Sequence, residues 1–317
     1  MKSTDHTRQS LAESITRNSS RQTYYTIRLF ADRPLRQDAY RAYAYFRWVD
    51  DCLDENTLEA RERIAFLERQ QALLEACYEG QTPSQTSPEE SMLVDLLRNH
   101  PQHGSGLELY LRNMMAVMRF DLKRRGRMVS QSELSQYSRM LATAVTEALH
   151  FFIGHNCPSP YGDARYLAVQ GAHIIHMLRD FHEDIQVGYF NIPVEFVREH
   201  ELDLENLDDP DFQVWVQSRI RLAETCFSLG REHISRVKNL RCRMAGFAYL
   251  ARFEWMLQAI EADRYRLRMA YPERKSLRAG LWVLRSTISL ALRPRLLEPI
   301  PRRNVAQFLS TLAGKEG

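Results

Sequence analysis

Apolar residues recur at intervals of three and four along most of the chain. The segments RIAFLERQQALLEACY (63–78) and RLAETCFSLGREHISRVKNL (221–240) show this spacing most clearly. It returns side chains to one face of an α-helix. Outside such segments, no run of five or more residues alternates apolar and polar positions in the manner of a half-buried strand. The pattern predicts an all-α fold of roughly ten helices.

Several helix starts are encoded by capping residues. SPEE (87–90) combines an N-cap serine, a first-turn proline and the acid of a capping box. Ser130 with Glu133, and the Ser-Pro pair at 159–160, have the same form. Glycine and proline gather in the breaks between the predicted helices, at 79–88, 99–106, 154–162 and 202–211.

These breaks are short, and none resembles a flexible interdomain linker. The 317 residues are therefore predicted to form a single all-α domain, 1–317. Residues 1–17 are expected to be loosely ordered, and 274–317 to form C-terminal helices. We find no internal repeat of 20–50 residues.

Composition narrows the function classes. Hydrophobic residues make up 44% and charged residues 26%, and the net charge of +3 does not indicate a nucleic-acid partner. The five cysteines are widely spaced, with no zinc-ligand pattern, which favours free thiols in a reducing cytoplasm.

The sequence shows neither a secretory signal at its N-terminus nor an uninterrupted apolar stretch long enough to span a membrane. LWVLRSTISLAL (281–292) is the most apolar segment. With Arg278, Arg285, Arg293 and Arg295 near it, this segment could lie on an anionic bilayer surface. The alternative, which we favour, is a C-terminal helix docked on the core.

Two acidic segments, WVDDCLDE (48–55) and LRDFHEDIQ (178–186), stand out against apolar flanks. On a helix, residues three or four apart share a face. Two stripes follow, one of Tyr43, Arg47, Asp50 and Asp54, the other of His173, His176, Asp180 and Asp184. Spacing alone does not decide whether Asp50 or Asp51 is the partner of Asp54.

A carboxylate buried among apolar residues needs a cation nearby, because removing its charge from water costs free energy. Mg²⁺ suits such oxygen ligands, because it shares the rest of its shell with water and phosphate oxygens. Arg47 and Arg179 each precede an acidic run and could pair with a diphosphate. The alternative is that the acids form salt bridges within their helices.

The segments also resemble the motifs of a known family, the squalene/phytoene synthases. YAYFRWVDDCLD (43–54) is similar to the family's first motif, Y-A-x-x-R-x-x-D-D-x-x-D. LRDFHED (178–184) matches the second motif, and GYFNIP (188–193) matches its continuation in part. TYYTIRLF (23–30) and LATAVTEAL (141–149), with Tyr137 before it, resemble further family segments.

The resemblance implies a helical bundle of the isoprenoid-synthase type around a central cavity. Asp50, Asp54, Asp180 and Asp184 would hold Mg²⁺ and act in catalysis, with Asp51 in support. Substrate-binding roles fall to Tyr43, Arg47, Tyr137, His176 and Arg179. The implied reaction joins two prenyl diphosphates, of the farnesyl or geranylgeranyl class, head to head through a cyclopropyl diphosphate. NADPH reduces that product in some members, but this sequence does not indicate it.

Departures from the family motifs lie in the same segments. His173 and His176 stand where Gln and Asn are usual, and Thr143 and Thr146 replace small glycines. Tyr189 and Asn191 replace the usual Arg and Tyr. We expect His176 to donate a hydrogen bond to diphosphate rather than bind Mg²⁺. Two alternatives remain: a terpene synthase-like enzyme acting on a single prenyl diphosphate, and a non-catalytic assembly or binding protein.

Overall fold

A computed structural model describes residues 2–55, 59–81, 85–155, 162–204 and 206–292, and side-chain burial from residue 11 onward. Within these ranges the chain forms thirteen α-helices, which confirms the all-α prediction. The chain divides into two compact units, 1–122 with 147–156, and 123–146 with 157–317. The prediction of a single domain stays a prediction.

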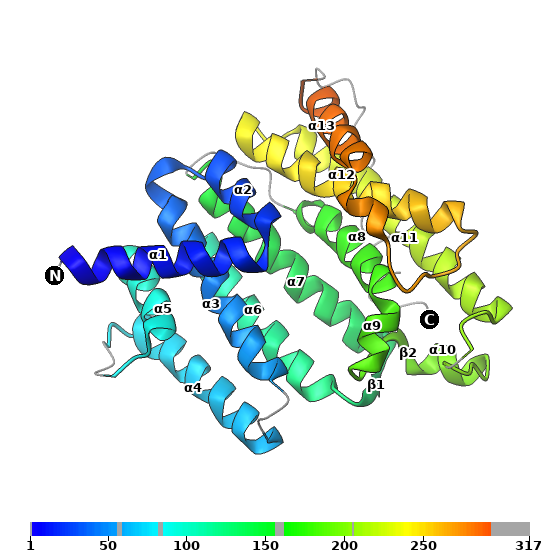
Figure 1. Cartoon of the computed structure of the whole chain (residues 1–317), viewed down its shortest axis with the longest axis horizontal. Coiled ribbons are helices and arrows are strands. Elements are labelled where there is room, and N and C mark those ends of the chain that lie inside the picture. Colours follow the sequence, from blue (N-terminus) through cyan, green and yellow to red (C-terminus); the bar gives the residue numbers. More distant parts are fainter. Residues whose placement is uncertain (1, 56–58, 82–84, 156–161, 205, 293–317) are drawn as a thin grey trace. The chain divides into compact units, whose positions relative to one another are not determined.

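The first unit is helical throughout its described part (Figure 1). Its core helix is α3, whose buried face includes Tyr45, Val49 and Leu53 and which packs against α1 and α5. The predicted capping box at Ser87 and Glu90 is confirmed at the start of α5. The unit contains α1 (Lys2–Ser19), α2 (Arg21–Phe30), α3 (Arg36–Asp54), α4 (Ala60–Tyr78), α5 (Pro88–Asn99), most of α6 (Gly106–Arg124) and the end of α7 (Gln131–Phe152).

The second unit is built on the close packing of α8 (Ala164–Arg179) against α11 (Pro210–Ser235). Glycines permit this approach, because a Cβ on Gly230 would lie 2.5 Å from the backbone nitrogen of Ala168. Phe181 is buried beside Phe212 and Trp215, which anchors the chain directly after Asp180. The unit also contains α9 (Phe181–Gln186), α10 (Val194–Glu199), α12 (Leu240–Ala262) and α13 (Leu277–Leu292).

Two short strands in the second unit were not predicted. β1 (Arg127–Val129) pairs in parallel with β2 (Tyr189–Pro193). At three and five residues, neither strand is long enough to show a clear alternating pattern. Gly188, with φ +90°, accepts a hydrogen bond from the amide of Gly126 at 2.8 Å, and a Cβ there would lie 3.2 Å from that nitrogen. The strands place Tyr189 and Asn191 beside the second acidic segment.

Other sequence predictions have mixed outcomes. Ser130 and Glu133 form the expected reciprocal cap at the start of α7, with N–O distances of 3.1 and 2.8 Å. Residues Lys2–Ser19, expected to be loosely ordered in part, are helical. The Ser-Pro pair at 159–160 and residues 293–317 lie outside the described residues. No described helix is long and apolar enough to cross a membrane.

Candidate functional site

The first acidic stripe lies at the C-terminal end of α3, as predicted. An Nη atom of Arg47 lies 3.1 Å from Oδ2 of Asp50, and the other Nη donates to Asp51. The neighbouring carboxylates Asp51 and Asp54 are exposed. One arginine thus serves two of the three aspartates, so the predicted alternative of intrahelical salt bridges is present in part.

The surroundings of Asp50 disfavour its charged form. Burial raises the pKa of Asp50 to about 6, and the negative charge of Asp54 adds to the effect. Arg47 opposes the shift, but Asp121 on α6 contributes a further negative charge. Asp121 comes from a helix about 70 residues away in sequence, and no spacing argument identified it.

The second stripe crosses a break between two helices. α8 ends at Arg179, Asp180 lies between the helices, and α9 begins at Phe181. The i to i−4 hydrogen bonds nevertheless continue, from the Asp180 amide to His176 at 3.0 Å and from the Asp184 amide to Asp180 at 2.8 Å. Asp180 and Asp184 therefore keep helical spacing despite the break.

His173 faces α7 rather than the aspartates. The ring is buried, and its Nδ1 lies 3.1 Å from Oγ of Ser138. The ring also contacts that of Tyr137 edge-on, with 5.0 Å between the ring centres. Burial, followed by the positive charges nearby, lowers the pKa of His173 well below its usual value. It is a neutral packing residue of this unit.

Asp180 is surrounded by basic side chains. Arg179 donates to both of its carboxylate oxygens, from Nε at 2.6 Å, and Nε2 of His176 lies 2.9 Å away. An Nη atom of Arg274 approaches to 4.0 Å. Burial favours the neutral acid, but Arg179 and His176 outweigh it and lower the pKa of Asp180.

The ring of His176 is half exposed and is directed at Asp180. Desolvation lowers the pKa of His176, and the hydrogen bond to Asp180 opposes that shift. Arg252 on α12 adds positive charge close by. Its own pKa is lowered by desolvation and by the charges of Arg179 and Arg274. Sequence reasoning named neither Arg252 nor Arg274.

Asp184 has the opposite electrostatic environment from Asp180. Burial and the charge of Asp180 raise the pKa of Asp184 to about 7. The side chain that donates a hydrogen bond to Asp184 is neutral, because Nδ2 of Asn191 donates to Oδ2 at 2.6 Å. Asn191 itself is buried in β2.

Arg124, the last residue of α6, completes this network. It is buried and donates from Nη1 to Oδ1 of Asn191 at 2.7 Å. Its guanidinium lies 4.6 Å from the ring centre of Tyr137 and 4.7 Å from that of Tyr189. Tyr189 and Asn191, two of the departures from the family motifs, thus contact a buried arginine that the motifs did not reveal.

The aspartates of the two stripes are oxygen ligands of the kind that a divalent cation takes. Within the described ranges, no three His, Cys, Asp or Glu side chains lie close enough together to hold a metal ion. Mg²⁺ does not require three such ligands, because it binds through one or two carboxylates and completes its shell with water and phosphate oxygens. Burial, and after it the neighbouring acids, disfavour the charged forms of Asp50 and Asp184. A bound cation would favour those charged forms.

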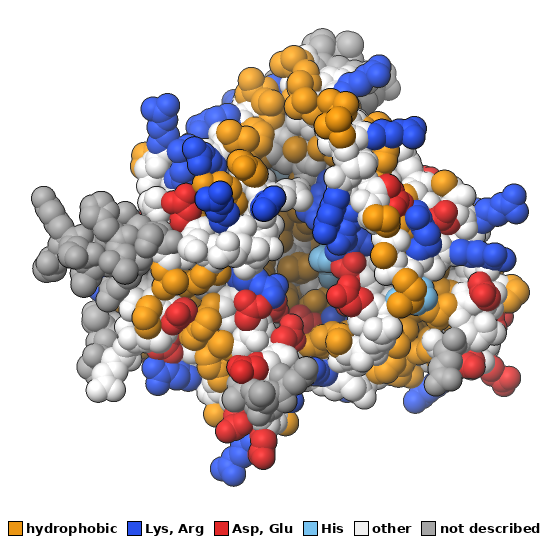
Figure 2. Space-filling view, in the orientation of Figure 1, with side chains coloured by type: hydrophobic (Ala, Val, Ile, Leu, Met, Phe, Trp, Pro, Cys, Tyr) orange, Lys and Arg blue, Asp and Glu red, His pale blue; other side chains and the backbone are white. Residues whose placement is uncertain are grey.

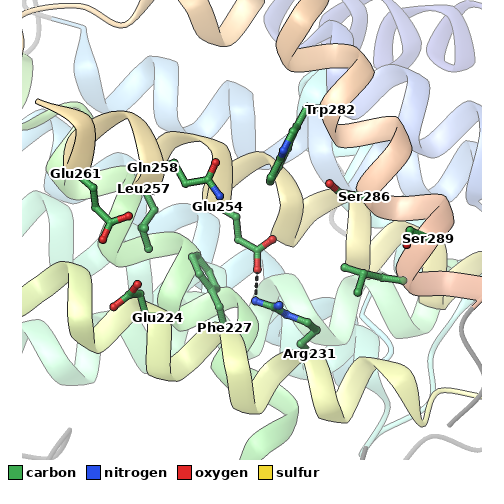
Figure 3. Close-up of a pocket in the computed structure, with 11 residues that line it drawn as sticks. Glu224, Phe227, Arg231, Glu254, Leu257, Gln258, Glu261, Trp282, Ser286 and Ser289 are labelled. Carbon is green, nitrogen blue, oxygen red and sulfur yellow. Dashed lines mark hydrogen bonds and ion pairs between the residues drawn. The ribbon is translucent and has the colours of Figure 1, made fainter. Parts of the chain in front are cut away.

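Among its described residues, the second unit has two cavities whose lining contains none of the aspartates of the acidic stripes. One of about 430 Å³ lies among α11, α12 and α13, with Arg231 and Glu254 paired in its wall (Figure 3). The other, of about 420 Å³, is lined by residues of 182–186, 206–208 and 266–269 together with Leu204. Neither includes a residue of the predicted site.

Comparison with known proteins settles the family. The squalene/phytoene synthase family model matches residues 16–280, most of the chain. The chain belongs to the squalene/phytoene synthase family. The matched residues include both acidic segments and the two strands. No curated protein sequence matches the chain.

Solved structures confirm the fold of this family member. Squalene synthase HpnC from Alicyclobacillus acidocaldarius superimposes with a TM-score of 0.66 at 19% identity, over 82% of this chain and 95% of that chain. A dehydrosqualene synthase in complex with ligand gives a TM-score of 0.69 at 17% identity, over 90% and 96%. The complex of TcSQS with the ligand BPH1237 gives 0.61 at 13% identity, over 97% and 98%. These identities establish the fold alone.

Proposed function

We propose that this chain is a Mg²⁺-dependent prenyltransferase that joins two prenyl diphosphates head to head and releases diphosphate. Family membership supports the general class of reaction. The observation that carries the finer proposal is the pair of acidic stripes at the motif positions, each with an arginine in contact with an aspartate. Burial and nearby acids raise the pKa of Asp50 to about 6 and that of Asp184 to about 7, and a bound cation would lower both.

Asp50, Asp54, Asp180 and Asp184 would hold Mg²⁺, which when bound neutralises charge on the departing diphosphate. Arg47 and Arg179 now contact the aspartates through their guanidinium groups. Each carries five N–H donors, so part of each fork remains for phosphate oxygens.

Three further side chains complete the proposed substrate site. His176 has a half-exposed ring beside Asp180, where it can donate to a phosphate oxygen when protonated. Tyr43 lies one turn before Arg47 on the same face of α3. Tyr137 is the third, and its ring also contacts Arg124, which donates to Asn191, itself a donor to Asp184.

We propose farnesyl or geranylgeranyl diphosphate as substrate, in the cytoplasm, with NADPH as an optional reductant of the product. The test incubates the purified chain with each diphosphate and Mg²⁺, with and without NADPH, and analyses products by mass spectrometry. The proposal expects a product with twice the carbon number of the substrate. A product of unchanged carbon number would instead indicate terpene synthase-like chemistry. Stoichiometric binding of Mg²⁺ and diphosphate without turnover would indicate a binding protein.

A further inference from the structure

Helix α13 carries its large aliphatic side chains on its exposed face. Trp282, Ser286 and Ser289 line the cavity that α13 shares with α11 and α12 (Figure 3). The buried residues of α13 are small: Ala279, Thr287 and Ala291. The large aliphatic side chains instead face outward: Leu277 is 80% exposed, Leu281 57%, Leu284 56%, Ile288 42% and Leu292 66%.

These five residues, which we call the leucine stripe, form one continuous surface. Successive members are three or four positions apart, so they fall within an arc of about 80° on the helix and span about 22 Å along it. Hydrophobic side chains gather over α13 in the space-filling view (Figure 2). Isolated exposed leucines are ordinary, but an aligned set of this size indicates a surface that binds something apolar.

The charges of α13 indicate which apolar partner fits. Arg278 and Arg285 are exposed and lie along one edge of the stripe, and residues 277–292 contain no Asp or Glu. Lys275 is also exposed, just before the helix. A symmetric contact between two copies of α13 would bring arginine toward arginine with no acid to pair. An anionic lipid surface supplies both an apolar layer and negative charge.

We propose that the leucine stripe docks this protein on an anionic bilayer, with α13 lying in the plane of the interface and its arginines at the phosphate headgroups. The leucines then enter the acyl boundary, where an interfacial helix buries its apolar face. The inference does not depend on the proposed reaction, and it is measured without turnover.

The experiment is flotation of the purified full-length chain with vesicles of phosphatidylcholine alone, and with vesicles that also contain phosphatidylglycerol. We expect the chain to float with the anionic vesicles and to be released by high salt, since headgroup attraction is screened. The double variant Leu281→Glu/Leu284→Glu should lower vesicle binding by at least about tenfold. Arg278→Gln and Arg285→Gln should each lower it about fivefold on anionic vesicles only.

The control is Val214→Glu, which adds one negative charge at an exposed apolar residue of α11 in the same unit. It should bind vesicles like the wild type. Circular dichroism and size-exclusion chromatography show whether each variant is folded and in which oligomeric state. Absence of flotation by the wild type, or an equal loss in Val214→Glu, would overturn the proposal. A wild-type dimer that the Leu281→Glu/Leu284→Glu variant converts to a monomer, without flotation, would assign the stripe to a second copy instead.

Discussion

Two carboxylates in the first unit, Glu90 and Asp50, have opposite electrostatic environments. Glu90, in the first turn of α5, accepts from Nε and Nη2 of Arg69 at 2.7 and 2.8 Å and from Gln70 at 2.9 Å. The hydrogen bonds from Arg69, against the effect of burial, lower the pKa of Glu90 to about 2. Asp50 has one arginine near it and further acids beside it, and its pKa rises to about 6.

The difference indicates that Glu90 holds the fold together, whereas Asp50 is suited to bind an added cation. Glu90 has donors for its charge, so an added cation would gain little there. Asp50 has too few, so a cation would gain more. The same contrast recurs between Asp180, whose pKa Arg179 and His176 lower, and Asp184, whose pKa rises to about 7.

The largest predicted effect is on turnover at Asp50. Asp50→Asn should lower kcat/KM by at least about a hundredfold, because it removes a charge needed beside the departing diphosphate. The control is Asp51→Asn, an exposed neighbour that contacts the same Arg47 and should lose less than about tenfold. Product formation measures both variants, and circular dichroism reports their folding. Equal losses in the two variants would contradict the special status of Asp50.

Glu90 should affect stability instead. Glu90→Gln weakens the hydrogen bonds that the exposed Arg69 donates to the buried Glu90 carboxylate, and should lower the free energy of unfolding by about 1 kcal/mol with near-normal kcat. Urea denaturation at neutral pH measures the change. An undiminished stability would mean that Glu90 does not hold α4 and α5 together.

The acid limb of the stability profile tests the same residue. The folded-state pKa of Glu90 is lowered from 4.5 to about 2, so its contribution is fully present above about 4.5 and is lost as pH falls toward 2. Wild type and Glu90→Gln should therefore converge in stability across that window. Parallel curves down to pH 2 would contradict the assignment.

The Arg124 network should have a smaller effect on activity. Arg124→Gln shortens the side chain that donates to Asn191, which in turn donates to Asp184. We expect roughly a tenfold loss of turnover, typical of residues that position a ligand without touching the metal. Lys123→Gln, which removes an exposed cation one residue earlier, should be near normal. Equal activities of the two variants would remove Arg124 from the account.

The smallest effect is predicted at Arg47. Arg47→Lys keeps the charge but loses the planar fork, so KM should rise about fivefold with little change in kcat. Steady-state kinetics with the prenyl diphosphate measure the split. An unchanged KM would make Arg47 a structural partner of Asp50 and Asp51.

The sequence predicted the helical part of this account well because helical spacing is local. Arg47, Asp50 and Asp54 share a face of α3 regardless of what packs against it. Asp121 and Arg124 escaped prediction because their proximity to Asp50 and Asp184 depends on how α6 packs. The strands were missed because three to five residues carry too little periodicity. His173 was placed on the metal-facing stripe, yet its ring packs on Tyr137 and Ser138.

The most direct test of the central claim is calorimetric titration of Mg²⁺ into the protein in the presence of inorganic diphosphate. The account predicts saturable Mg²⁺ binding by the wild type and by the double control Asp51→Asn/Glu183→Gln. It predicts binding weakened at least about a hundredfold in Asp50→Asn/Asp184→Asn, which removes one acid from each stripe. Equal Mg²⁺ affinity in the two double variants would contradict the claim that these aspartates hold the metal.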